Sequence, residues 1–418
     1  MSTDTPLSSR IVAPSPLTSQ RQMRDLNSSV VLTLLWDAPT DTGLTASEIV
    51  EKTNLTRATV LSICGELKEQ NWVTEDRAPS EVRGRGRQAR RFTFNRRRHL
   101  IAAADIGFRS TTSVIADLKG TVLGRGQRVT VPESLKENRT DLLISTLDEA
   151  LHDAYATPEQ IDAACIGVAV PVTHDGTPYP SEPTNPFWEN MRIDQQRLRS
   201  SYPTWHTYIE NDANLAALAE GRTRSNLNSN TMVTLLAGQR LGAGIIINGE
   251  LFRGVNGGAG EMGYLENFTS INTELSPPIG SLGIIGSVHK LLWEARQKKK
   301  DTTLWEIGTN ETNWPDLDDV WFAAQKGDNL AKDIVKRVSD HLTAAILTLS
   351  NFIDPGLVVI AGGAAEQAIP LLPDIRTKLA KHSPFPSTVE ISILGRDVVL
   401  TGAIHNAIQQ VRLNASES

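Results

Sequence analysis

An arginine-rich stretch in the first quarter of the chain has the composition of a nucleic-acid contact. Residues 77–98 contain nine arginines, no lysine and a single acidic residue, Glu81. The guanidinium group presents N–H donors in a fixed geometry that matches phosphate oxygens and base edges. A surface that is merely solvated usually contains more lysine than arginine, so this composition favours a DNA contact. Arg83, Arg85 and Arg87 alternate with glycines, which allow the backbone to approach a groove closely. We therefore predict that these three arginines contact DNA.

Helices predicted before this stretch would position it. Apolar residues at helical spacing predict a helix over residues 24–37. Thr45 and Glu48 have the spacing of a capping box at the start of a second helix, and Thr56 is placed to cap a third helix over residues 57–67. Two short helices joined by a tight turn form either a helix-turn-helix or an ordinary helical hairpin.

The residues that follow favour the helix-turn-helix. Predicted strands at residues 72–73 and 91–95 flank the loop of alternating arginines and glycines, which is the pattern of a wing. In such a domain the N-terminal end of the second helix of the motif faces base edges. We therefore expect Thr56, Arg57 and Thr59 to contact DNA as well.

The distribution of charge divides the chain. Residues 1–100 contain 15 Lys and Arg against 11 Asp and Glu, whereas the remaining residues carry a net charge of −10. A length of 418 residues is enough for two or three domains. We assign residues 1–20, rich in Ser, Thr and Pro, to a disordered lead-in. Residues 21–98 form the predicted winged helix-turn-helix, and residues 99–418 form a second, larger domain.

Several classes of protein are excluded or disfavoured. The chain has no run of about 18 apolar residues, and its first residues lack the pattern of a signal peptide. Cys64 and Cys165 are the two cysteines of the sequence and show no pairing pattern, so disulfides and a multi-cysteine metal site are not expected. These observations fit a cytoplasmic protein.

Beyond residue 100 the sequence resembles the ROK family (repressors, open reading frames and sugar kinases). Six segments carry the resemblance in the expected order as far as the C-terminal region: Asp105-Ile106-Gly107, Ile166 to Pro171, Asn185 to Trp188, Glu210 to Asn214, Gly257 to Gly263, and Asp354 to Gly363. The resemblance implies an α/β fold, a two-lobed actin-like ATPase fold of the sugar-kinase type. The N-terminal winged helix-turn-helix stands where the family's repressors carry one.

The resemblance also implies a sugar site. Asp212 corresponds to the carboxylate that takes a proton from the sugar hydroxyl in the family's kinases. Asn211 and Glu261 would bind sugar hydroxyls, and Trp188 would cover an apolar face of the ring. Such a convergent polar site rejects sugars that lack one of the expected hydroxyls. The implied effector-binding residues are Asn185, Trp188, Asn211, Asp212, Glu261 and Tyr264.

The phosphate loops differ from those of the family's kinases. Phosphoryl transfer needs backbone amides that approach the phosphates closely. Phe108 stands where the kinases have a second glycine, and Gln239 and Arg240 replace a hydroxyl residue and a glycine of the second loop. We therefore expect no kinase activity and no nucleotide cofactor, with Asp212 as a vestigial base. Arg109 and Arg240 are left with two interpretations, anion binding or solvation.

The zinc site of the family is missing too. The resemblance places Tyr264, Glu274, Ser276 and Ser281 at the four ligand positions, and this set cannot hold a structural zinc ion. Gly283 stands where a sugar-contacting Glu is usual. We therefore expect no metal, and the identity of the effector cannot be carried over from zinc-containing relatives.

Three functions compete. The first is a sugar-responsive repressor of carbohydrate-utilisation genes that binds operator DNA and a sugar or sugar phosphate. The second is an active ATP-dependent sugar kinase that also binds DNA, which the altered phosphate loops disfavour. The third is a DNA-binding protein whose second domain serves only for assembly, which the joint presence of Asn211, Asp212 and Glu261 disfavours. We predict the first.

The predicted mechanism requires at least two copies of the chain, in a homodimer or a homotetramer. Closure of two lobes around the ligand would change the placement of the winged domains, and half-site spacing makes operator binding sensitive to that placement. Residues 334–352 are apolar at helical spacing, which fits either a dimer contact or ordinary burial in the core.

Overall fold

The chain is described from a computed structural model. It describes residues 20–38, 43–77, 90–129, 138–179, 193–224, 231–262, 282–307 and 314–417. Contacts within the chain divide it into two compact units. The larger unit comprises residues 99–410, and the smaller comprises residues 1–98 together with residues 411–418, which the sequence analysis places in the second domain.

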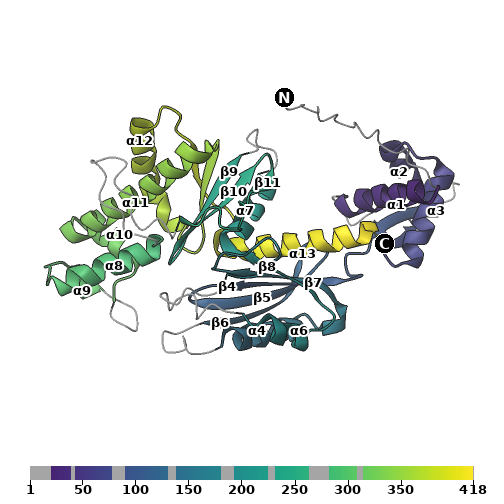
Figure 1. Cartoon of the computed structure of the whole chain (residues 1–418), viewed down its shortest axis with the longest axis horizontal. Helices are drawn as coiled ribbons and strands as arrows, with labels where there is room; N and C mark the ends of the chain where they lie inside the picture. Colours follow the sequence, from purple (N-terminus) through teal and green to yellow (C-terminus); the bar gives the residue numbers. More distant parts are fainter. Residues whose placement is uncertain are drawn as a thin grey trace, which may run out of the picture. The chain divides into compact units, whose positions relative to one another are not determined.

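The smaller unit contains a helix-turn-helix and a three-stranded antiparallel sheet with the strand order β1-β3-β2. Both predicted caps are present: Thr45 and Glu48 form the capping box of α2, and the Thr56 side chain accepts from the Thr59 amide at the start of α3. Asn54 ends α2 in the left-handed region, with a φ of 57°. The elements of this unit are α1 (Gln20–Asp37), β1 (Leu44–Thr45), α2 (Ala46–Thr53), α3 (Arg57–Glu69), β2 (Val73–Arg77) and β3 (Arg90–Phe94) (Figure 1).

Aromatic rings join α1 to the sheet of this unit. The Trp36 ring stacks on Phe94 with a centroid separation of 4.4 Å and lies 5.9 Å from the ring of Trp72. Arg412, near the end of α13 (Val398–Glu417), places its guanidinium carbon 4.7 Å from the centroid of the Trp36 ring and forms an ion pair with Asp37. The C-terminal turns of α13 therefore complete the core of the smaller unit.

The larger unit contains two five-stranded sheets with the same topology. Their strand orders are β6-β5-β4-β7-β8 and β11-β10-β9-β12-β13. In each sheet three consecutive strands are antiparallel, and two later strands add parallel to the first of them. This repeated α/β topology is that of the expected actin-like fold. The strands are β4 (Leu100–Ile106), β5 (Ser110–Asp117), β6 (Val122–Val129), β7 (Ile161–Val168), β8 (His206–Asn211), β9 (Met232–Ala237), β10 (Leu241–Ile247), β11 (Glu250–Leu251), β12 (Leu357–Ala361) and β13 (Thr388–Ile391).

Helices cover both sheets. In the first sheet, alternate residues of β4 and β7 pack against α4 (Arg139–Asp153) and α6 (Gln195–Ser201), which lie together on one face (Figure 1). In the second sheet, Val358 and Ile360 face the cluster formed with α8 and α11, whereas Leu357 and Val359 face α7. This alternation follows from the period of two in a strand. The remaining helices are α7 (Asp212–Thr223), α8 (Ile284–Gln297), α9 (Leu304–Ile307), α10 (Leu317–Lys326), α11 (Asn329–Ile353) and α12 (Leu372–His382).

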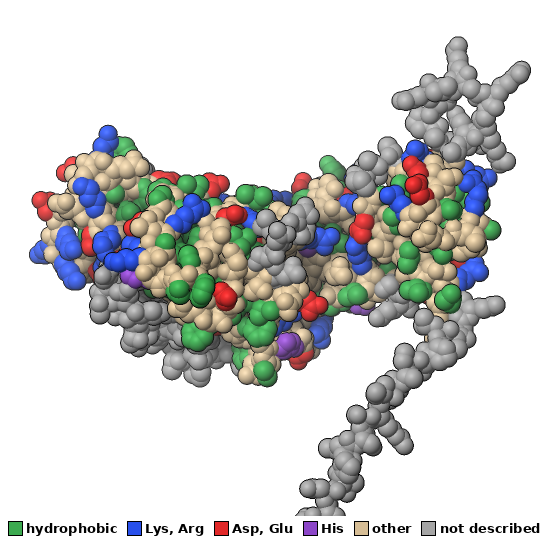
Figure 2. Space-filling view, turned by 90° about the horizontal axis from the view of Figure 1, so that it is seen from above, with side chains coloured by type: hydrophobic (Ala, Val, Ile, Leu, Met, Phe, Trp, Pro, Cys, Tyr) green, Lys and Arg blue, Asp and Glu red, His purple; other side chains and the backbone are tan. Residues whose placement is uncertain are grey.

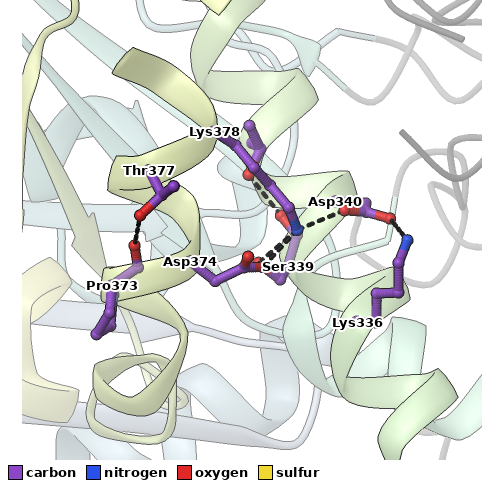
Figure 3. A network of polar contacts seen from close by, with 8 residues as sticks. Lys336, Ser339, Asp340, Pro373, Asp374, Thr377 and Lys378 are labelled. Carbon is purple, nitrogen blue, oxygen red and sulfur yellow. Dashed lines mark hydrogen bonds and ion pairs between the residues drawn. The ribbon is translucent and has the colours of Figure 1, made fainter. Parts of the chain in front are cut away.

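A charged network fixes α12 to α11 (Figure 3). The Asp340 side chain is fully buried, and its two oxygens accept from Lys336 Nζ at 2.7 Å and from Lys378 Nζ at 2.5 Å. Ser339 donates to Asp374 at 2.6 Å, and Asp374 also pairs with Lys378. A buried carboxylate requires such compensation, because an unpaired charge in the interior is strongly destabilising.

The apolar side of α11 is largely internal. Ile334, Val338 and Leu342 are buried in the second-sheet core, whereas Phe352 is 85% exposed. Core packing therefore accounts for most of the apolar pattern over residues 334–352. Within the ranges that the structure describes, every helix is too short or too polar to cross a bilayer.

Candidate functional site

A cavity of about 470 Å³ in the larger unit brings together segments from both sheets. Its wall includes the turn after β4, the N-terminus of α7, the turn between β9 and β10, and the glycines that follow β12. The two loops that the sequence analysis compared with phosphate loops therefore line one space with three of the six predicted effector-binding residues. Asn211, Asp212 and Glu261 all line it.

Asn211 has two roles at this wall. Its Oδ1 accepts from the Asn214 amide at 3.1 Å, which makes it the N-cap of α7. Its Nδ2 donates to the Val170 carbonyl at 3.1 Å and to Glu261 Oε1 at 3.4 Å. The helix cap thus fixes an amide that orients Glu261, and Asp212 follows as the first residue of α7.

Three carboxyl groups in the cavity have raised pKa values. Burial raises the pKa of Asp105, Asp212 and Glu261 to about 7 each. The charge of Asp212 further raises the pKa values of Asp105 and Glu261, while Arg240 lowers that of Glu261. Carboxyl groups with pKa values near neutrality can both donate to and accept from sugar hydroxyls.

The replaced phosphate-loop residues face this same space. Phe108, Arg109, Gln239 and Arg240 all line the cavity. Arg109 Nη2 lies 3.4 Å from His289 Nδ1, and burial together with the Arg109 charge lowers the pKa of His289. Because a guanidinium group has only donors, His289 Nδ1 accepts from Arg109. A phenyl ring and three long polar side chains therefore form this part of the cavity wall.

Glu210 and Arg253, for which the sequence predicted no role, hold Asn211 and Asn214 in place. Arg253 Nη2 and Nε lie 2.7 and 2.9 Å from Glu210 Oε2. Glu210 Oε1 accepts from the Asn211 amide at 2.8 Å and from Asn214 Nδ2 at 2.9 Å. The position of an acid directly before Asn211 is the signal that could have revealed this support. Asp105, which was noted as part of a loop motif, is likewise a cavity residue.

Gly283, which the sequence resemblance aligns with a sugar-contacting glutamate, has no room for a side chain. It precedes α8, and a Cβ at this position would lie 2.3 Å from the carbonyl oxygen of Gly238 and 2.5 Å from that of Arg240. A glutamate therefore cannot occupy this position without movement of the backbone of the second phosphate loop.

In the smaller unit, the residues predicted to contact DNA from a helix lie at the N-terminus of α3. Thr56 and Arg57 are exposed, and the hydroxyl groups of Thr56 and Thr59 lie 2.8 Å apart. Arg57 Nη1 donates to Ser47 Oγ at 2.9 Å, which connects α3 to α2. The face shown in Figure 2 carries Lys and Arg side chains together with Asp and Glu side chains.

Several predicted positions lie outside the described residues. β2 and β3 are paired from Val73 and Phe94 to Arg77 and Arg90, so they enclose the predicted wing tip. The described ranges contain no group of three or more His, Cys, Asp or Glu side chains that could hold a metal ion. The positions outside the described ranges are Arg83, Arg85, Arg87, Asn185, Trp188 and Tyr264, as well as the zinc-ligand positions Glu274, Ser276 and Ser281.

Comparisons with known sequences connect this architecture to one family. A model of the ROK family matches residues 101–391. A xylose repressor from Caldicellulosiruptor bescii is 25% identical over 403 residues, which cover 93% of this chain and 97% of the repressor. An N-acetylglucosamine repressor from Escherichia coli O157:H7 is 24% identical over 341 residues, 79% of each chain. A glucokinase from Halalkalibacterium halodurans is 27% identical over 203 residues, 46% of this chain and 61% of the glucokinase.

Solved structures have the same fold. A ROK family transcriptional regulator, described as a homologue of the Escherichia coli MLC protein, superposes with a TM-score of 0.65 at 19% identity, over 95% of this chain and all of that chain. A ROK family glucokinase from Streptomyces griseus, in complex with glucose and AMPPNP, superposes with a TM-score of 0.55 at 22% identity, over 74% of this chain and 99% of that chain.

Proposed function

Because the chain belongs to the ROK family, we propose that it is a sugar-responsive transcriptional repressor whose kinase-like domain binds the effector without phosphorylating it. The observation that carries this proposal is the joint presence of a helix-turn-helix unit and a cavity whose wall combines the carboxyl groups of Asp212 and Glu261 with the bulky side chains of Phe108, Gln239 and Arg240. The similarity to two sugar repressors over most of their lengths supports the same function.

The cavity favours binding over phosphoryl transfer. In-line transfer requires close approach of the phosphates to backbone amides. Phe108, Gln239 and Arg240 line the space that such phosphates would need. An active sugar kinase that also binds DNA is the second candidate, and the position of Asp212 in the cavity is the observation in its favour.

The proposed effector site comprises the cavity residues together with residues outside the described ranges. Sugar hydroxyls would exchange hydrogen bonds with Asn211, Asp212 and Glu261. The proposed effector-binding set is completed by Asn185, Trp188 and Tyr264. The proposed DNA contacts are Thr56, Arg57 and Thr59 at the start of α3 and Arg83, Arg85 and Arg87 in the wing. We further propose that the chain acts in the cytoplasm as a homodimer or homotetramer, because winged readers bind paired half-sites.

Effector binding would act by closing the two lobes of the larger unit around the cavity. A ligand shifts this equilibrium only through a difference in affinity for the open and closed forms. A change of operator affinity by a factor of 5 to 150 needs a coupling free energy of about 1–3 kcal/mol between the effector site and the DNA-binding surface.

The experiment is a DNA-binding titration with a panel of sugars. Fluorescence anisotropy of an operator fragment, selected from the genomic DNA that the purified protein retains, would be measured with D-xylose, D-glucose, N-acetylglucosamine and their phosphates. At least one sugar should change operator affinity by about fivefold or more. ADP release would be followed in parallel with ATP present. Turnover at ordinary kinase rates, or an operator affinity that no member of the panel changes, contradicts the proposal.

A further inference from the structure

A second cavity, of about 400 Å³, lies within the larger unit, and Glu210, the residue before Asn211 in β8, is part of its wall. Its wall is formed by the loop Thr173–Gly176, by α6, by residues of β8 and by α13. Among the described residues that line it, Leu198 and Ile209 supply the apolar side chains and nearly all the others are polar.

The charges around this cavity balance. Arg199 and Arg253 line it together with Asp175 and Glu210. Glu210 is bound by Arg253, and the Glu210 side chain is 8% exposed against 31% for Arg253. A ligand in this space meets no net charge, so a neutral molecule fits it better than a phosphate or a carboxylate.

The other polar groups can donate and accept hydrogen bonds. Gln195, Asn406 and Gln410 contribute amides, and Thr207 and Tyr208 contribute hydroxyls. Asn406 Oδ1 is buried and has no hydrogen-bond partner among the described residues, which leaves a local acceptor unsatisfied. Amides and hydroxyls beside an aromatic ring match a molecule that carries many hydroxyl groups.

We propose that this cavity is a second ligand site, which binds a neutral sugar or polyol. Binding of a ligand in this second cavity would also affect the first cavity, because a short chain of side-chain contacts connects the two. Arg253 at the second cavity holds Glu210, and Glu210 in turn accepts from the amide of Asn211, which lines the first cavity, and from Asn214 in the first turn of α7. Binding at either cavity then changes affinity at the other by the same factor, because coupling between binding sites is reciprocal.

The test is hydrogen exchange of the full-length chain, followed by mass spectrometry, with D-glucose, D-xylose, sorbitol and glucose 6-phosphate as probes. The background is Asp212→Ala, which weakens the first cavity. At least one neutral probe should slow exchange in residues 173–179 and 194–201, and glucose 6-phosphate should do so less. Protection confined to segments of the first cavity, or stronger protection by glucose 6-phosphate, overturns the proposal.

Two variants locate the ligand. Asn406→Leu removes a polar group from the cavity wall, and Gln195→Ala does so on α6 without touching the core. Each should weaken the probe about tenfold, which is the effect of losing one good hydrogen bond. Gln409→Leu, exposed on α13 beside the cavity, is the matched control and should leave binding unchanged. If Asn406→Leu and Gln195→Ala bind the neutral probe as tightly as the control Gln409→Leu does, and the thermal midpoints of all three are unchanged, the site is excluded.

The link through Glu210 has its own readout. In the Asp212→Ala background the neutral probe should also change exchange of residues 210–214. Because Arg253 both lines the second cavity and holds Glu210, Arg253→Lys should reduce that change by a larger factor than it reduces protection of residues 194–201. An unaltered response in Arg253→Lys contradicts the link. Because none of these measurements involves operator DNA, the second site can stand if the proposed repressor function fails, and the reverse also holds.

Discussion

Asn211 and Glu261, which both line the first cavity, are joined by a hydrogen bond of 3.4 Å from Nδ2 to Oε1. The same Asn211 side chain caps α7 through its other atom, Oδ1. Asn211 therefore fixes the start of α7, whose first residue is Asp212, and it also orients the Glu261 carboxylate. Loss of either partner should be visible in ligand binding before it is visible in the fold.

Glu261→Ala should weaken binding of the effector sugar by about tenfold or more, because the variant removes a hydrogen-bonded carboxylate and leaves Asn211 Nδ2 with one partner fewer. Isothermal titration calorimetry with the sugar identified in the operator assay measures this loss. Glu250→Ala, an exposed acid on β11, is the control and should bind normally. Equal affinities for the two variants would remove Glu261 from the site.

Asp212→Asn should stabilise the protein more at pH 8 than at pH 5. Burial raises the folded-state pKa of Asp212 to about 7 from an ordinary value of 3.8, so the folded state binds the proton more tightly than the unfolded state. The stabilisation that this provides is complete below pH 3.8 and is lost as the pH rises to about 7, at up to about 1.4 kcal/mol per pH unit. Asparagine is neutral throughout and escapes that loss. Thermal midpoints of both proteins at the two pH values check the sign, and a gain that is larger at pH 5 would show that the Asp212 pKa is not raised.

Arg57→Ala should reduce operator affinity by about tenfold or more, as expected for an arginine that contacts a base or phosphate from the start of a recognition helix. Its hydrogen bond to Ser47 provides a matched control, since Ser47→Ala removes the bond and keeps the charge. Lys68→Ala removes a positive charge from the other end of α3. Anisotropy titrations at several salt concentrations separate these variants, and a loss in Lys68→Ala equal to that in Arg57→Ala would point to charge alone.

Arg412→Ala should destabilise the smaller unit by about 1 kcal/mol, mainly through loss of the guanidinium contact with the Trp36 ring. Asp37 is 54% exposed, so its ion pair with Arg412 adds little, and Asp37→Asn should have a much smaller effect. Hydrogen exchange of residues 22–37 and 90–94 at increasing denaturant concentration follows this unit separately from the larger one. A destabilisation by Asp37→Asn that matches that of Arg412→Ala would assign the effect to the ion pair.

Local sequence signals were enough for the helix-turn-helix. Thr45, Glu48 and Thr56 act through hydrogen bonds to residues three positions away, so their spacing predicts both caps directly. The strand predicted at residues 72–73 extends to Arg77 because β3 supplies partners for residues 74–77. Such pairing depends on a strand more than ten residues distant, which a local pattern does not contain.

The candidate site was predictable only in part. Asp212 and Glu261 carry recognisable motifs, and both line the cavity. The ion pair between Glu210 and Arg253 was missed because it joins β8 to a segment 43 positions later. The two interpretations of Arg109 and Arg240 could not be separated from sequence either, since exposure to solvent and exposure to a cavity leave the same pattern of polar residues.

The membership of residues 411–417 in the smaller unit has a consequence for synthesis. A ribosome releases the helix-turn-helix early, yet Arg412, which packs on Trp36, emerges only after every strand of both sheets. The DNA-reading unit is therefore finished last although it is begun first. A chain whose translation stops within the larger unit lacks this final packing, so its helix-turn-helix is less stable than that of the complete chain.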